Sequence, residues 1–154
     1  QLTNAGLETL FSADLECLPT PPILRMLNLS ENKSSAITDK VISLAIQASV
    51  MQYNGGLVYL NMNSASKDTD KALENLASTC SKSLIEVDLS FCHSIKDEGL
   101  GYFVSKVNDQ LETIHLWGCA QITDKFLDGH ARAAKKNNNR AALNIIGSWM
   151  KKST

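Results

Sequence analysis

Residues 111–127 read LETIHLWGCAQITDKFL and contain the clearest copy of a repeated sequence pattern. It has apolar residues at its first, fourth and sixth positions, a cysteine at its ninth, and Ile-Thr-Asp from its twelfth. Three earlier stretches open with the same apolar triplet, so four copies begin at Leu24, Leu57, Leu84 and Leu111, at steps of 33, 27 and 27 residues. A period in the twenties predicts a leucine-rich solenoid, in which each repeat buries its apolar face against its neighbours.

Each copy joins a strand pattern to a helix pattern. The opening residues alternate between apolar and polar, which predicts a short parallel strand whose leucines face the core. An acidic residue follows the first leucine by thirteen positions, as Asp70, Asp97 and Asp124. We expect these aspartates to cap helices by accepting hydrogen bonds from free backbone N–H groups. The repeating unit of strand, turn and helix predicts an α/β fold with a curved parallel sheet.

The pattern makes residues 1–154 one leucine-rich-repeat domain of about five repeats, which we expect to be the C-terminal part of a longer protein. In the final segment we expect residues 143–145 to form the last strand, with Arg140 at the first-leucine position. The predicted segments are a partial repeat at 1–22, repeats at 23–55, 56–83, 84–110 and 111–139, and a C-terminal cap at 140–154.

Composition narrows the possible partners. The 15 lysines and arginines nearly balance the 16 acidic residues, which leaves a formal net charge of −1. Such a balance gives no general attraction to nucleic acid, so we expect no direct nucleic-acid binding. No apolar run approaches the roughly 18 residues that cross a bilayer, so we expect no membrane partner either.

The cysteines indicate an intracellular protein. Cys92 and Cys119 occupy the same position in their copies, where a side chain points into the core and a thiol packs as a small apolar group. We therefore expect both to be reduced, in the cytoplasm or the nucleus. Zinc is disfavoured because Cys17, Cys80, Cys92 and Cys119 lack the close pairing of structural zinc ligands, and we expect no metal or other cofactor.

The residues resemble the cysteine-containing class of leucine-rich repeats. Leu-x-x-Leu-x-Leu-x-x-Cys followed by Ile-Thr-Asp-x-x-Leu carries the resemblance, which is closest over 84–100 and 111–127. Ala65 departs from it, standing where the second copy should have Cys or Asn. The class is typical of F-box proteins, whose repeats select substrates for cullin-RING ubiquitin ligases. It also occurs in the leucine-rich-repeat subunit of a fungal nucleotide-excision-repair damage-recognition complex.

The resemblance implies a non-catalytic protein-interaction module. The expected partners are proteins, namely a ubiquitin-ligase adaptor and a substrate. The alternatives are a structural scaffold subunit of a large complex and the repair subunit itself. Glu86, Asp88 and Glu112 could lie beside His115 on neighbouring strands, as an acid–base pair would. We favour a cross-strand charge interaction instead, because no nucleophile or oxyanion donor is specified nearby.

The concave strand face is the expected binding surface, because the residues between the leucines point outward there. Trp117 and Tyr59 are its best anchors, since aromatic side chains dominate binding hot spots. Packing over the strand-to-turn corner is an equal alternative for Trp117, and packing is favoured for Phe91. Asn144 would extend the row into the last strand. The predicted protein-binding residues are Asn28, Tyr59, Asn61, Glu86, Asp88, Thr113, His115 and Trp117.

Overall fold

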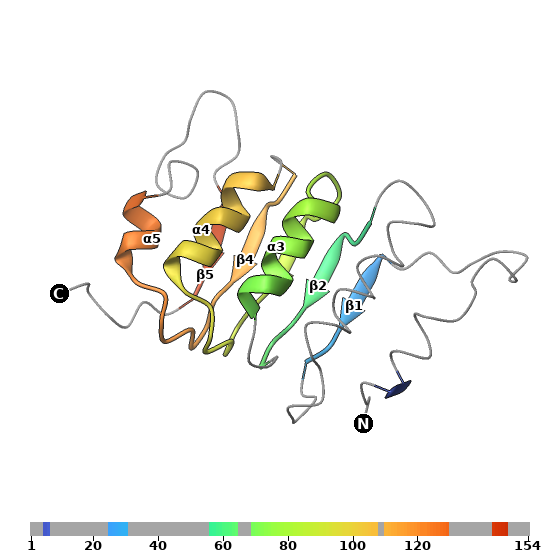
Figure 1. Ribbon diagram of the computed structural model, residues 1–154, viewed down its shortest axis with the longest axis horizontal. Coiled ribbons are helices and arrows are strands. Elements are labelled where there is room, and N and C mark those ends of the chain that lie inside the picture. Colours follow the sequence, from blue (N-terminus) through green and yellow to red (C-terminus); the bar gives the residue numbers. More distant parts are fainter. Residues whose placement is uncertain are drawn as a thin grey trace, which may run out of the picture.

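The computed structural model describes residues 5–6, 25–30, 56–64, 69–107, 110–129 and 143–147. The described strands and helices form two layers, with the helices packed on one face of a parallel sheet (Figure 1). The strands are β1 (Met26–Asn28), β2 (Tyr59–Asn61), β3 (Glu86–Asp88), β4 (Thr113–His115) and β5 (Asn144–Ile146). The helices are α3 (Thr69–Thr79), α4 (Asp97–Lys106) and α5 (Asp124–Gly129).

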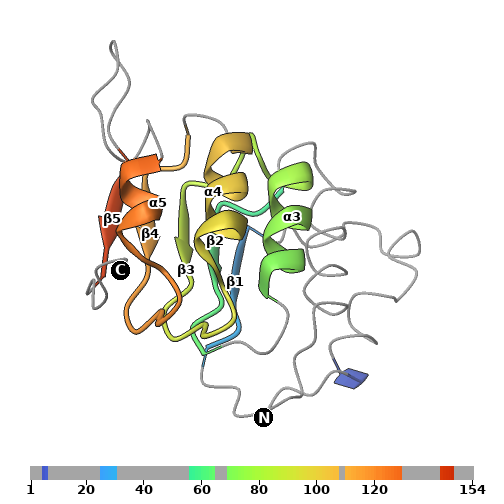
Figure 2. The ribbon, with the colours of Figure 1, turned by 60° about the vertical axis from the view of Figure 1, so that its left-hand side comes forward.

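The sheet follows the order of the chain. Its five strands pair in the order β1-β2-β3-β4-β5, and every pair is parallel. Helices α3, α4 and α5 lie beside one another in the same order on one side of the sheet (Figure 2). The predicted α/β class and parallel sheet are confirmed, and the arrangement is compatible with a leucine-rich-repeat solenoid.

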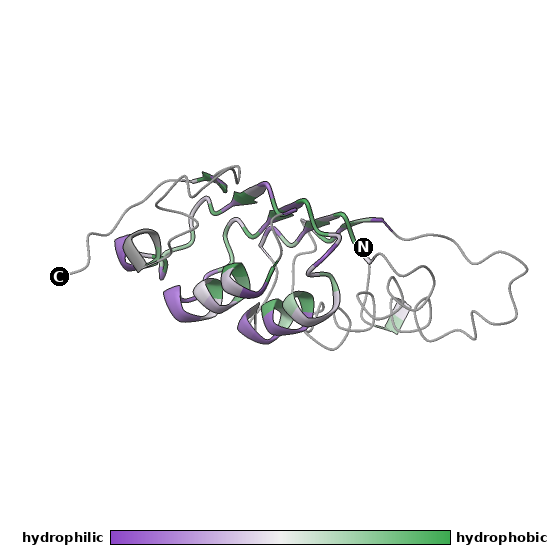
Figure 3. Cartoon of the chain, turned by 90° about the horizontal axis from the view of Figure 1, so that it is seen from above, coloured by the Kyte–Doolittle hydropathy of each residue, from purple (hydrophilic) through white to green (hydrophobic). Residues whose placement is uncertain are grey.

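The core lies between the two layers. The middle residue of each strand points toward the helices, and these residues align in one row: Leu27, Leu60, Val87, Ile114 and Ile145. Phe103 of α4 and Phe126 of α5 close over this row and are fully buried. Figure 3 shows the corresponding pattern, with the apolar sides of the helices turned toward the strands and hydrophilic residues turned away. Burying such side chains stabilises the fold by about 1.5–3 kcal/mol each.

Two buried thiols join successive copies. The Cys92 Sγ lies 3.2 Å from the Met62 carbonyl oxygen, and the Cys119 Sγ lies 3.1 Å from the Leu89 carbonyl oxygen. Each thiol thus donates to the residue that ends the apolar triplet of the preceding copy. Both cysteines are free and buried, in the core position that the sequence predicts. Burial raises the pKa of the Cys119 thiol, because desolvation disfavours the thiolate.

The predicted role of the aspartates as helix caps is wrong where the structure resolves it. Helix α4 begins at Asp97, so the capping position belongs to Lys96, whose side chain makes no capping hydrogen bond. In α5 the cap is Thr123, whose hydroxyl accepts the Lys125 N–H at 3.2 Å. The Asp97 carboxylate instead accepts the Thr123 N–H at 2.7 Å and the Thr123 hydroxyl at 2.5 Å. The aspartate therefore joins its copy to the next one.

The last strand is present, but its predicted register is wrong by two residues. Asn144 pairs with Thr113, and Ile146 pairs with His115, so Ile146 rather than Asn144 extends the row of outward residues. Gly147 explains the shift, because a Cβ there would lie 3.0 Å from the backbone carbonyl of Leu116. The residue that lies opposite Leu116 in the sheet is therefore best a glycine. The apolar spacing of Leu143 and Ile145, on which the prediction was based, does not contain this requirement.

Several predictions fall outside the described residues. They concern the partial repeat at 1–22, apart from Ala5 and Gly6, and the cap at 140–154, apart from residues 143–147. Cys17 and Ala65 also lie outside the described residues. Within the helices of the described residues, none is long and apolar enough to cross a bilayer.

Candidate protein-interaction face

The strand register brings the predicted binding residues together on the side of the sheet opposite the helices, which we call the strand face. One row of neighbours consists of Asn28, Asn61, Asp88 and His115. A second, parallel row consists of Met26, Tyr59, Glu86 and Thr113. Trp117 follows His115 by two residues, just beyond the end of β4. The eight predicted residues thus lie on one continuous surface.

Three of these residues also stabilise the strand ends. The Oδ1 atom of Asn28 accepts the N–H of Ser30, that of Asn61 accepts the N–H of Asn63, and that of Asp88 accepts the N–H of Ser90, each at 2.9 Å. Side chains of Asn and Asp commonly bond the backbone two residues onward, forming an Asx turn. The sequence carries this signal as Asn or Asp followed two positions later by Ser or Asn, and the binding interpretation overlooked it.

His115 holds the same position in the fourth copy but makes no such turn, and another acceptor is used there. The Trp117 N–H donates to the Ser90 hydroxyl at 3.2 Å, in place of the acceptor that Asn or Asp would supply. Ser90 is the buried polar side chain among the described residues, at 2% exposure. A serine that looks like one more outward residue is therefore a buried link between β3 and the segment after β4.

The His115 ring instead reaches diagonally across the sheet. Its Nε2 lies 3.0 Å from Oε1 of Glu86, although Asp88 is its direct neighbour in the register. The cross-strand pairing that we favoured is present as a hydrogen-bond contact between His115 and Glu86. Both side chains are partly exposed, so the solvent-screened pair contributes about 0–1 kcal/mol to stability.

The aromatic residues of the strand face differ in exposure. Tyr59 is half-buried, and its hydroxyl lies 3.4 Å from the Asn61 Nδ2. Trp117 and Phe91 are 47% and 48% exposed, so neither is absorbed into the core. The Phe91 ring nevertheless covers Gly118, where an added Cβ would lie 2.5 Å from the ring. Phe91 thus packs in part, as favoured, while about half of its surface stays available.

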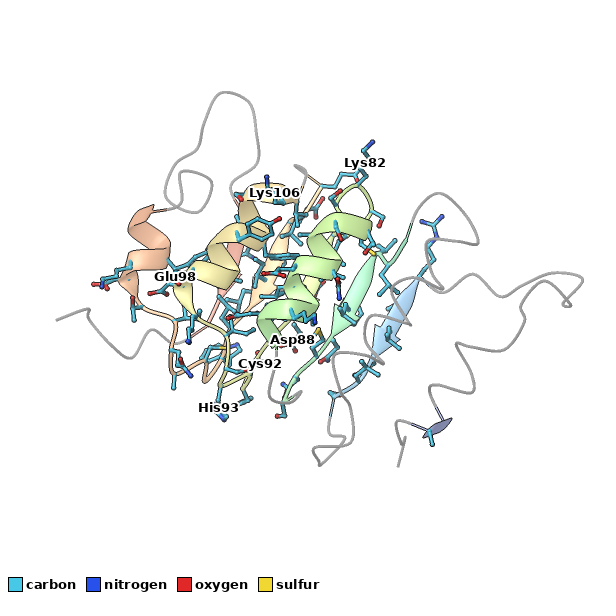
Figure 4. The ribbon with its side chains drawn as sticks, in the orientation of Figure 1. Lys82, Asp88, Cys92, His93, Glu98 and Lys106 are labelled. Carbon is cyan, nitrogen blue, oxygen red and sulfur yellow. The ribbon has the colours of Figure 1, made fainter. Side chains whose placement is uncertain are left out.

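Charge is unevenly distributed between the two layers. The strand face carries Glu86 and Asp88 at its centre, and the outward positions of the described strands hold neither lysine nor arginine. Charges of both signs lie on the helix layer, where Figure 4 shows Glu98 and Lys106 on α4 while Asp88 lies on β3. The described part of the chain groups no three His, Cys, Asp or Glu side chains that could hold a metal ion.

Comparisons with known proteins agree with the fold. No family profile matches the sequence, and no curated protein matches it. One chain of the crystal structure of the Rad7 and Elc1 complex in yeast is similar in structure, with a TM-score of 0.55 and 22% sequence identity. The similarity covers 83% of this chain and 33% of that one, so this chain spans about one third of its structural neighbour. The likeness shows a shared α/β fold.

Proposed function

We propose that this chain is a non-catalytic leucine-rich-repeat module that binds a partner protein through the strand face. The observation that carries the proposal is the alignment of Tyr59, Glu86, His115 and Trp117 on a continuous surface that no helix of the described residues covers. Mixed aromatic and polar side chains on a rigid sheet are what a protein partner can recognise. The buried thiol bonds and the four leucine-rich copies support assigning the fold to the cysteine-containing class.

We further propose that the module recognises substrates for an intracellular cullin-RING ubiquitin ligase, in the cytoplasm or the nucleus. The resemblance of residues 84–127 to the repeats of F-box proteins supports this role. The structural likeness to a chain of the Rad7 and Elc1 complex is a second support, because that neighbour was crystallised in a complex of two proteins. The same likeness favours one alternative, a subunit of a nucleotide-excision-repair damage-recognition complex.

Affinity purification of the full-length protein tests the proposal. Partners would be identified by mass spectrometry for the unchanged protein, for His115→Ala/Trp117→Ala, and for Tyr102→Ala. Tyr102 is the matched control, because it lies on α4 and is 48% exposed, close to the 47% of Trp117.

The proposal expects a cullin adaptor with all three proteins and a further protein that only the strand-face variant loses. Reproducible absence of a cullin adaptor would contradict the ligase assignment. Recovery of damage-recognition proteins instead would favour the repair alternative. If the strand-face variant kept every partner while Tyr102→Ala lost one, the strand face would not be the binding surface.

A further inference from the structure

Two half-exposed aromatic residues, Phe91 and Trp117, lie at the exits of the neighbouring strands β3 and β4. The Phe91 N–H donates to the Trp117 carbonyl oxygen at 2.6 Å, and the Phe91 ring lies against Gly118. These contacts hold the two residues side by side, and we call Phe91 and Trp117 the aromatic rim. At 48% and 47% exposure, both rings present apolar surface to solvent.

The backbone of Phe91 suggests that this placement is more than packing. Its φ is +58°, a left-handed conformation that is unfavourable for residues with a Cβ. Ser64 and Gly118 have φ values of +60° and +66° at the same position of the neighbouring copies, so all three copies share this backbone conformation, and only the glycine adopts it without strain. The chain thus keeps a bulky, half-exposed residue at a position where the neighbouring copies have serine and glycine. Exposed aromatic side chains of this kind are common among the residues that dominate protein-binding surfaces.

The aromatic rim adjoins the acidic centre of the strand face. The Trp117 N–H bonds the Ser90 hydroxyl, and the Ser90 N–H bonds the Asp88 Oδ1, so two hydrogen bonds connect the rim to this carboxylate. The described part of the chain donates no hydrogen bond to the second oxygen of Asp88. Glu86 lies on the same strand, two residues before Asp88, and shares one oxygen with His115. Carboxylates beside exposed aromatic rings complement a cationic side chain.

We propose that the aromatic rim, Glu86 and Asp88 together recognise an arginine in an extended segment of a partner protein. This inference rests on the proposed function, because it names the chemistry of the partner that the strand face binds. A guanidinium group stacks on an aromatic ring and donates paired hydrogen bonds to carboxylates. Arginine fits this combination better than lysine, whose ammonium group is a compact point charge without a planar face.

The chain itself supplies conservative variants for the test. Asp88→Asn should keep the Asx turn, because Asn28 and Asn61 already make that turn in the preceding copies. Glu86→Gln keeps an oxygen that can accept a hydrogen bond from His115. The double variant Glu86→Gln/Asp88→Asn therefore removes two charges without removing the acceptors. Glu74→Gln/Glu98→Gln is the matched control, since it removes two exposed carboxylates from helices α3 and α4.

The experiment selects random peptides displayed on phage against the whole chain and measures the affinity of the enriched peptides by fluorescence anisotropy. We expect enrichment of arginine over the starting library. We expect Glu86→Gln/Asp88→Asn to weaken binding by roughly threefold to thirtyfold, and the helix control to stay within about twofold. Replacing the peptide arginine by citrulline, its neutral isostere, should weaken binding to the unchanged protein to a similar degree. That comparison does not depend on how any variant folds.

Three outcomes would overturn the inference. They are selection of peptides without arginine, equal binding of the lysine and arginine forms of a selected peptide, and unchanged affinity for Glu86→Gln/Asp88→Asn. If Trp117→Ala still abolished binding in any of these cases, the strand face would remain the binding surface and only the arginine assignment would fail. If Trp117→Ala also bound every peptide normally, the proposed function would fail together with the inference.

Discussion

Ser90→Ala tests the bond that replaces an Asx turn at the end of β4. In the unchanged protein, the buried Ser90 hydroxyl accepts the Trp117 N–H at 3.2 Å. Alanine removes this acceptor and leaves a partly buried backbone donor without a partner, which costs about 1–3 kcal/mol. We expect the lower half of that range, because solvent reaches part of Trp117. In thermal unfolding, each kcal/mol corresponds to a fall in Tm of about 2–4 °C for a chain of this size.

A second substitution should restore the missing acceptor. His115 holds the position that Asn28, Asn61 and Asp88 hold in the other copies, where the side chain accepts the N–H two residues onward. His115→Asn in the Ser90→Ala background should therefore form an Asx turn to Trp117 and recover about 1 kcal/mol. His115→Asn alone should change stability by no more than about 1 kcal/mol, the value of a partly exposed pair with Glu86.

Urea denaturation followed by circular dichroism would measure the four free energies of this double-mutant cycle. Ser105→Ala is the control, because the exposed Ser105 hydroxyl bonds the Tyr102 carbonyl oxygen within its own helix. The control should stay within about 0.5 kcal/mol of the unchanged protein. A Ser90→Ala variant as stable as this control, or a double variant no more stable than Ser90→Ala, would refute the reasoning about the strand ends.

Three further predictions address other contacts. Asp97→Ala removes two charge-assisted hydrogen bonds to Thr123 and should lower the free energy of unfolding by about 2–4 kcal/mol. A loss below about 0.5 kcal/mol would show that this aspartate does not hold the two copies together. Gly118→Ala adds a Cβ at a φ of +66° against the Phe91 ring and should cost at least about 1 kcal/mol, whereas an unchanged Tm would contradict this packing. Folding raises the pKa of the Cys119 thiol above its usual 9.0, because the buried site favours the protonated form. The stability gained from this preference is complete below pH 9.0 and is lost as the pH rises through the folded-state pKa. The free energy of unfolding should therefore decline between pH 8 and 10, with this thiol contributing at most about 1.4 kcal/mol per pH unit. The decline should be smaller in Cys119→Ala. Identical declines in the two proteins would show that the thiol does not contribute.

The fold could be predicted from the sequence because its main signals are short-range and repeated. Apolar residues at fixed spacings place Leu60, Val87 and Ile114 in the core, and alternation within each strand places their neighbours outside. The register of the last strand was predicted wrongly because its apolar residues fit two registers equally well. A steric fact about Gly147 and the backbone of Leu116 separates those registers, and such a fact appears only in three dimensions.

The candidate surface could be predicted more easily than the roles of its residues. The register and outward direction of Tyr59, Asp88 and His115 follow from the pattern. The sequence does not show that Ser90 turns inward, or that His115 prefers Glu86 to its direct neighbour Asp88. Both arrangements depend on which backbone N–H groups at the strand ends still need an acceptor. The acceptor can come from the neighbouring copy, about 27 residues away in sequence, so a local pattern does not reveal it.

Binding through the strand face is best tested by the affinity of the Trp117→Ala variant for a partner captured by the full-length protein. Aromatic hot-spot residues cost about 2 kcal/mol or more on truncation, so binding should weaken by roughly thirtyfold. Tyr102→Ala removes an equally exposed aromatic side chain from the helix layer and should change the affinity by less than about twofold. Both variants should unfold within a few degrees of the unchanged protein. Unchanged affinity for Trp117→Ala, with a large loss for Tyr102→Ala, would place the binding surface on the helices and contradict the account.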